Sequence, residues 1–252
     1  MSDYDLIAPF YNIEHAQFDE DLDMYRNFAE LRGSPLLELA CGSGRLLLPL
    51  AREGYEITGV DDSASMLKLA QSALREAGLA DRCKLVQQDI CTMRLEQKFR
   101  LAFAALGSFA HISTRKRQQQ ALAAIRAHLA PGGMFILDIS NADVRYMEGL
   151  SGQMLHQGTW RQEDGTLLTH FVSPASSTSM HLLELTHFYD VHKQGGPVQR
   201  TVINTRLYLF ERSEMELLLE HAGFAIKEVY GDYDFGPYEL ESPRMIFLAE
   251  AG

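Results

Sequence analysis

The chain has 252 residues, of which 34 are Asp or Glu and 23 are Lys or Arg, giving a net charge of −11. Its 46% hydrophobic and 23% charged residues are typical of a globular protein and exclude a disordered or collagen-like one. This acidic balance disfavours a nucleic-acid partner. No apolar run of about 18 residues and no signal peptide is found, so we expect a soluble protein that does not enter a membrane. Cys41, Cys83 and Cys91 form no CxxC pair, which indicates reduced thiols in the cytoplasm and no structural metal.

Residues 1–34 are rich in acidic and aromatic side chains, with Leu22, Tyr25 and Phe28 at helical spacing, and predict a helical segment. Strands and helices alternate after it as far as residue 140. The expected strands are residues 35–40, 55–60, 84–86, 101–106 and 134–137, and the expected helices are residues 43–53, 63–77 and 118–129. Because these strands are almost unbroken apolar runs, the α/β pattern predicts a parallel sheet covered on both faces.

The pattern changes after Ser140, where strand-like alternation replaces the helical period. Gly195-Gly196-Pro197 predicts a hairpin turn within it. We therefore expect an antiparallel β insertion over residues 141–210. The elements expected after it, in residues 211–252, are a helix with Ser213 and Glu216 as a capping box, and two strands at 225–230 and 245–249.

The first strand runs into the segment Glu38-Leu-Ala-Cys-Gly-Ser-Gly-Arg45, which has two glycines before a helix. Such glycines allow a tight turn that brings a ligand close to the backbone N–H groups. Asp61 and Asp89 end the second and third strands, where carboxylates can accept hydrogen bonds from a ribose and from an adenine amino group. Carboxyl ends of parallel strands meet at one edge, so the pattern predicts a site for an adenosine-containing ligand in residues 35–140.

A dinucleotide is the alternative ligand for such a turn. Its fingerprint needs a third glycine where this chain has Leu47, and this disfavours a pyrophosphate. The pair Tyr189 and Lys193 matches a dehydrogenase YxxxK motif, but it lies in sequence with a strand pattern, so we interpret the match as chance.

These residues resemble a known family. LLELACGSGR, GVDDS and VQQDI are similar to motifs of the class I S-adenosylmethionine-dependent methyltransferases, in which an acidic residue stands four positions before the first glycine. LGSFAHI at 106–112 and the late β insertion resemble the small-molecule N-methyltransferases, including glycine and amino-sugar N-methyltransferases. The resemblance covers the chain. It implies a Rossmann-like, seven-stranded, mostly parallel sheet with the last strand antiparallel, and residues 1–34 as a lid.

The resemblance also implies roles for individual residues. Gly42 and Gly44 would pass the methionine part of S-adenosylmethionine, with Glu38 near its ammonium group. Asp61 would hold the ribose, Asp89 and Ile90 the adenine edge, and Leu106 would lie beside the sulfonium. The full set implied for the cofactor is Tyr11, Glu38, Ala40, Gly42, Gly44, Arg45, Asp61, Asp62, Met66, Asp89, Ile90 and Leu106.

Two departures concern the methyl acceptor. Gly107 stands where many relatives have Asn, and the Arg with which glycine N-methyltransferase clamps a carboxylate has no clear counterpart, so glycine is a poor candidate substrate. An amine must lose a proton before it attacks, and His111 after the fourth strand is our candidate base, or else a structural histidine. Asn141 and Trp160 are candidate acceptor-side residues, although Trp160 could instead pack a homodimer contact.

We therefore expect a cytoplasmic enzyme that transfers a methyl group to a nitrogen atom of a small molecule and uses no metal ion. The alternatives are methylation of a protein or nucleic acid, and a cofactor-binding protein without transfer activity.

Overall fold

A seven-stranded sheet organises most of the chain in the computed structural model, which describes residues 3–15, 18–141, 149–176, 181–193 and 195–252. The strands run in the order β10-β11-β5-β4-β1-β2-β3, and β11 is antiparallel to both of its neighbours. Their bounds are β1 Leu36–Leu39, β2 Ile57–Asp61, β3 Cys83–Gln87, β4 Phe99–Ala104, β5 Leu129–Ser140, β10 Phe224–Tyr230 and β11 Arg244–Ala251. The predicted mostly parallel sheet with an antiparallel last strand is confirmed.

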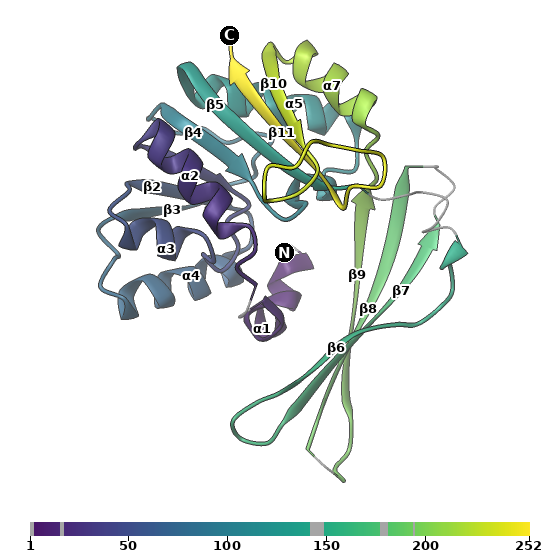
Figure 1. Ribbon diagram of the computed structural model, residues 1–252. Coiled ribbons are helices and arrows are strands. Elements are labelled where there is room, and N and C mark those ends of the chain that lie inside the picture. Colours follow the sequence, from purple (N-terminus) through teal and green to yellow (C-terminus); the bar gives the residue numbers. More distant parts are fainter. Residues whose placement is uncertain (1–2, 16–17, 142–148, 177–180, 194) are drawn as a thin grey trace.

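Helices cover both faces of this sheet (Figure 1). One apolar core joins the sheet to α5 (Arg115–His128) and α7 (Arg212–His221), and a second joins it to α2 (Leu22–Arg32) and α3 (Leu47–Arg52). The helix α4 (Ala64–Glu76) packs beside β2 and β3. Its N-terminus is capped by Ser63, whose Oγ accepts a hydrogen bond from Met66 N at 3.1 Å. None of the helices described is long and apolar enough to cross a bilayer.

A second sheet of four antiparallel strands extends from the larger one (Figure 1). Its strands are β6 (Leu155–Arg161), β7 (Leu167–Ser176), β8 (Leu182–His192) and β9 (Gln199–Tyr208), which confirms the antiparallel insertion. The N-terminal helix α1 (Asp3–His15) lies between α4 and this sheet, where Ile7 and Ala8 join a core with Met66, Tyr189 and Ile203. Residues 142–148, at the start of the expected insertion, lie outside the described residues.

Three local predictions need correction. The helix expected over 43–53 spans only Leu47–Arg52, because residues 42–46 form the turn before it. The strand expected over 134–137 is longer, because β5 begins at Leu129 directly after α5 and includes Pro131-Gly132-Gly133, where the pairing of β4 with β5 shifts register. The capping box was wrong, since α7 begins at Arg212 with Glu211 at its N-cap, and Glu216 pairs with Arg212 at 2.7 Å.

Candidate functional site

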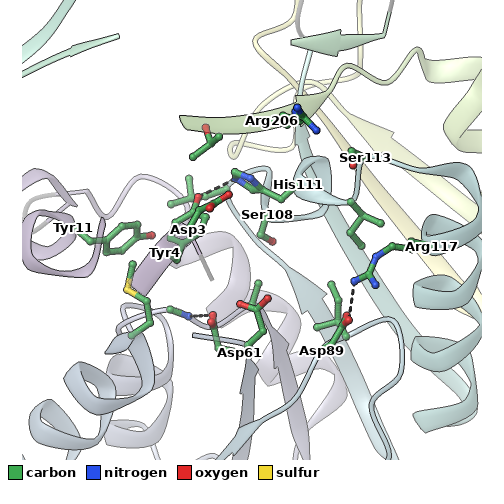
Figure 2. A pocket seen from close by; sticks show the side chains of 18 of the residues that line it. Asp3, Tyr4, Tyr11, Asp61, Asp89, Ser108, His111, Ser113, Arg117 and Arg206 are labelled. Atoms are coloured by element: carbon green, nitrogen blue, oxygen red, sulfur yellow. Dashed lines mark hydrogen bonds and ion pairs between the residues drawn. The ribbon is translucent and has the colours of Figure 1, made fainter. Parts of the chain in front are cut away.

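A cavity of about 780 Å³ opens at the carboxyl ends of β1, β2, β3 and β4, between the two sheets and α1. Figure 2 shows Asp61 and Asp89 on one side of it, Arg206 on the other, and Tyr4 and His111 between them. The predicted residues that line it are Tyr11, Ala40, Gly42, Asp61, Asp62, Met66, Asp89, Ile90, Leu106 and His111. The lining therefore joins residues that are far apart in the sequence.

The turn after β1 has an unusual backbone. Ala40 has a φ of 51° and Gly42 a φ of 54°, both in the left-handed region. This conformation costs a non-glycine residue about 1–2 kcal/mol, and such residues often mark ligand sites. A Cβ on Gly42 would meet no atom within 4 Å, so the turn presents open space to the cavity. Gly44 does not line the cavity. Its hydrogen faces α4, where a Cβ would lie 3.2 Å from Ala70 Cβ, so it permits close packing.

Asp61 ties this turn to the end of β2. Its two carboxylate oxygens accept hydrogen bonds from Gly42 N at 2.8 Å and from Ser63 N at 2.9 Å. Burial raises the pKa of Asp61, although the two backbone hydrogen bonds oppose that shift. The neighbouring Asp62 is exposed and also lines the cavity. Two adjacent carboxylates thus stand at the end of β2, one fixed and one free to adapt.

Asp89 occupies the corresponding place after β3. Its oxygens accept hydrogen bonds from Cys91 N at 2.9 Å and from Arg117 at 2.7 Å. Burial acts to raise the pKa of Asp89, but these two donors outweigh it and hold the pKa below its usual value. Arg117 lies on α5, so the ion pair joins the third strand to a distant helix at the cavity wall.

The end of β4 is held by a residue that the sequence reasoning missed. Leu106 has a φ of 50°, and its N–H donates to Asp138 Oδ2 at 2.8 Å. Asp138 is completely buried in β5 and also accepts from Tyr233 at 3.1 Å and from Arg244. Only the apolar run before it was visible in the sequence, and its two side-chain partners lie about a hundred residues away.

Glu38 and Arg45, which were expected to contact a ligand, do not line the cavity. Glu38 is 4% exposed, and burial raises its pKa well above the usual value. Its Oε2 has no hydrogen-bond partner among the described residues. Arg45 makes two hydrogen bonds of 2.6 Å to the buried Asp21 and stacks on Phe18 at 5.1 Å. It therefore fastens the segment before α2 to the glycine turn.

The helix α1 supplies two tyrosines to the cavity. Tyr4 Oη lies 2.9 Å from His111 Nε2, across an edge-to-face contact of the two rings (Figure 2). Burial lowers the pKa of His111 and raises that of Tyr4. At neutral pH the imidazole is consequently uncharged and the phenol keeps its proton. Tyr11 stacks on His15, and burial raises the pKa of Tyr11 to about 12.

The second sheet closes the cavity with two kinds of residue, both missed from the sequence. Thr205 is 4% exposed and lies on the face of β9 that packs on α1. Its exposed neighbours Asn204 and Arg206 lie on the other face of β9, at the rim of the cavity. Arg206 pairs with Glu184 at 3.0 Å, and Asn204 pairs with Thr186 at 3.0 Å. Period-2 alternation was visible in the sequence, but it could not show which face meets the core.

The structure does not bring Asn141 and Trp160 into the cavity lining. The Asn141 amide donates to the carbonyls of Leu240 and Ser242 at 2.9 and 2.8 Å and accepts from Tyr238, so it holds the loop before β11. Trp160 packs at the edge of the apolar core under α1.

Comparison with known proteins agrees with this geometry. Residues 36–133 match a family model described as a methyltransferase domain. The chain therefore carries an S-adenosylmethionine-dependent methyltransferase domain. It is 24% identical over 208 residues to the dTDP-3-amino-3,4,6-trideoxy-alpha-D-glucopyranose N,N-dimethyltransferase of Streptomyces venezuelae, covering 79% of this chain and 78% of that protein.

Solved structures share the fold of this methyltransferase. An S-adenosylmethionine-dependent methyltransferase from Clostridium acetobutylicum matches with a TM-score of 0.81 and 22% identity, over 100% of both chains. The sugar N-methyltransferase KedS8 from Streptoalloteichus matches with a TM-score of 0.76 and 22% identity, over 98% of this chain and 92% of that one.

The residues of the cavity fit S-adenosylmethionine, the cofactor of this methyltransferase. The glycine turn leaves room at Gly42 for a ligand against the backbone, and carboxylates stand at the ends of β2 and β3. Two buried oxygens, Glu38 Oε2 and Ser108 Oγ, lack partners within the described part of the chain, and Ser108 lines the cavity. These oxygens can accept hydrogen bonds from hydroxyl, amino and ammonium groups, whereas they offer few hydrogen-bond donors to a phosphate.

Proposed function

We propose that this methyltransferase transfers its methyl group to an amine nitrogen of a small molecule. The charge of the cavity wall carries the proposal. Five carboxylates line it, from Asp3, Asp61, Asp62, Asp89 and Glu184, against two guanidinium groups, both paired with lining carboxylates. Such a wall favours a cationic acceptor over an anionic one, and an amine is cationic before it reacts. The relative from Streptomyces venezuelae is itself named as an N,N-dimethyltransferase.

We assign the cofactor to the strand ends. Asp61 and Asp62 would accept from the ribose hydroxyls, and Asp89 with the backbone of Ile90 would accept and donate at the adenine edge. Met66 would pack near the adenine, and Leu106 would lie near the sulfur; all six residues line the cavity. Glu38 would offer its buried Oε2, which has no hydrogen-bond partner among the described residues, as an acceptor near the ammonium group. When bound, the cofactor supplies a strongly electrophilic sulfonium methyl group, so the chain's own task is to position a neutral nitrogen in line with it.

The acceptor nitrogen must lose one proton, and we assign that proton to His111. The imidazole is uncharged at neutral pH and lines the cavity, so it can accept a proton at Nε2, directly or through the Tyr4 hydroxyl. We also propose a cytoplasmic location, which the three free cysteines support.

An acceptor screen tests the reaction. D-glucosamine and other amines are incubated with S-adenosylmethionine and the protein, beside counterparts without an amine such as D-glucose, and S-adenosylhomocysteine and methylated products are measured by mass spectrometry. We expect turnover of amines only. Methylation of the hydroxyl compounds, or of a peptide or RNA included in the screen, would contradict the proposal that the target is a nitrogen of a small molecule.

The variant His111→Gln tests the base. Because its pKa is lowered, His111 is the free base above a pH that lies below about 6.5, and activity should fall as the pH drops through that point. The variant should lower kcat by about 100-fold and remove this acid limb of the pH–rate profile. The control is His156→Gln, on the exposed side of β6. An unchanged profile in His111→Gln would exclude His111 as the base.

A further inference from the structure

A row of four polar side chains runs from α1 across the second sheet to the cavity. Glu14 Oε1 lies 2.6 Å from His170 Nδ1, an ion-pair distance. His170 Nε2 lies 3.0 Å from His187 Nδ1, and His187 Nε2 lies 2.9 Å from Thr205 Oγ1. The four residues come from α1, β7, β8 and β9, and the last of them lines the cavity.

Burial and stacking fix this row in place. The side chains of Glu14 and His170 are 8% and 9% exposed, and Thr205 is 4% exposed. The Tyr189 ring stacks on His170 at 4.2 Å, and His170 stacks on His187 at 5.2 Å. A polar chain in such a setting is costly to rearrange, because any unpaired member would stay buried.

The carboxylate at one end gives the row a direction. Burial, with smaller contributions from His170 and His111, lowers the pKa of His187 to about 4, so His187 is uncharged at neutral pH and carries one N–H. A carboxylate only accepts, which favours a proton on His170 Nδ1. When Nδ1 carries the only proton of His170, its Nε2 accepts from His187 Nδ1, and His187 Nε2 accepts the hydroxyl proton of Thr205.

We infer that Glu14, His170 and His187 turn the Thr205 hydroxyl proton inward and leave Thr205 Oγ1 as a hydrogen-bond acceptor for an N–H group of the methyl acceptor. The inference rests on the proposed N-methylation and names how the nitrogen is held. His111 takes the proton that leaves the nitrogen, and Thr205 holds one that stays. Thr205 contacts the substrate, whereas Glu14, His170 and His187 are positioning residues that act through it.

Substitutions at Thr205 test the contact. Thr205→Val keeps the shape and removes the oxygen, so kcat/KM for an amine such as D-glucosamine should fall about 10- to 100-fold, mainly through KM. Thr205→Ser keeps the hydroxyl and should stay within about threefold of the wild type, a rescue that a purely structural role would not require. Affinity for S-adenosylmethionine should not change in either variant. The control is Thr159→Val, an exposed threonine of β6.

The position of the imidazole protons tests the direction of the hydrogen bonds along this row. Long-range ¹⁵N NMR of histidine-labelled protein, at about pH 8 so that an ordinary histidine is uncharged, reports which ring nitrogen carries the proton. We expect Nδ1–H at both His170 and His187, and a shift of His187 toward Nε2–H in Glu14→Gln. A proton on His187 Nε2 in the wild type overturns the inference, since Thr205 would then donate into the cavity.

The two experiments also separate this inference from the proposed function. If the wild type methylates no amine, the proposed function fails and with it the contact between Thr205 and an acceptor N–H, while the NMR result still decides whether the row leaves Thr205 Oγ1 as an acceptor. If amines are methylated while Thr205→Val behaves like the wild type, the proposed function stands and the inference fails.

Discussion

Asp61 serves the fold and the cavity with one carboxylate. Each oxygen already accepts one backbone N–H, from Gly42 or Ser63, and each keeps a lone pair for a ligand. Any group that replaces it must accept two N–H donors at once. The residue therefore couples the shape of the glycine turn to ligand binding.

We predict that Asp61→Asn raises the Kd for S-adenosylmethionine about tenfold or more. The amide NH₂ would face one of the two backbone donors, and one ribose hydrogen bond would be lost, at about 1–3 kcal/mol. Isothermal titration measures the affinity, and Asp81→Asn, exposed before β3 at the opposite edge of the sheet, is the control. Unchanged affinity in a folded Asp61→Asn protein would exclude the ribose assignment.

At the same scale, the sequence predicted the residues whose position follows from strand ends alone. Gly42, Asp61 and Asp89 come to one edge because parallel strands place their carboxyl ends together. Residues whose neighbours are distant in the chain were beyond such reasoning. Asn141 looked like a substrate ligand, but its amide is satisfied by a loop about a hundred residues later.

Among the elements, α1 is the one that joins the parts of the site. At its start, Asp5 Oδ1 accepts from Ser63 Oγ at 2.7 Å and from Ser65 N at 3.0 Å, and so ties α1 to the N-terminus of α4. At its end, Glu14 contacts His170 of the second sheet. Tyr4 and Tyr11 of the same helix line the cavity. A loosened α1 would thus expose the ligands on that side.

We predict that Asp5→Asn speeds the release of S-adenosylmethionine by about three- to tenfold. The substitution weakens two hydrogen bonds and removes a negative charge from the N-terminus of α4, together about 1 kcal/mol. Stopped-flow displacement of the cofactor measures the rate. Asp23→Asn on α2, whose side chain is 87% exposed, should leave the rate unchanged. Equal rates in Asp5→Asn and the wild type would show that α1 does not retain the cofactor.

The elements themselves were largely readable from hydrophobic periodicity, because buried strands and amphipathic helices leave distinct patterns. The first and last residues of these elements were harder to predict. Ser213 and Glu216 have the spacing of a capping box, but the helix already begins at Arg212, with Glu211 at its N-cap, and Glu216 pairs with Arg212 instead. The face of β9 that meets α1 depends on contacts with distant residues, and period-2 alternation alone does not specify them.

At the scale of the whole molecule, the net charge of the chain and the charge around the cavity are both negative. The chain carries a net charge of −11, and carboxylates outnumber guanidinium groups around the opening. A field of this sign attracts cations and repels phosphate-rich polymers.

We predict that kcat/KM for a cationic amine falls several-fold when salt rises from about 0.05 to about 0.5 M, since ions screen this attraction. The assay uses saturating S-adenosylmethionine, so that only the encounter with the acceptor is measured. An increase with salt would point instead to an anionic acceptor.

The two walls of the cavity come from separate stretches of the chain. Residues 40–112 form the wall assigned to the cofactor, and β7, β8 and β9 form the wall opposite. Substitutions in those three strands can therefore change which molecule is methylated while the turn around Gly42 stays intact. A new acceptor can therefore be gained by substitution in one wall without loss of the donor site in the other.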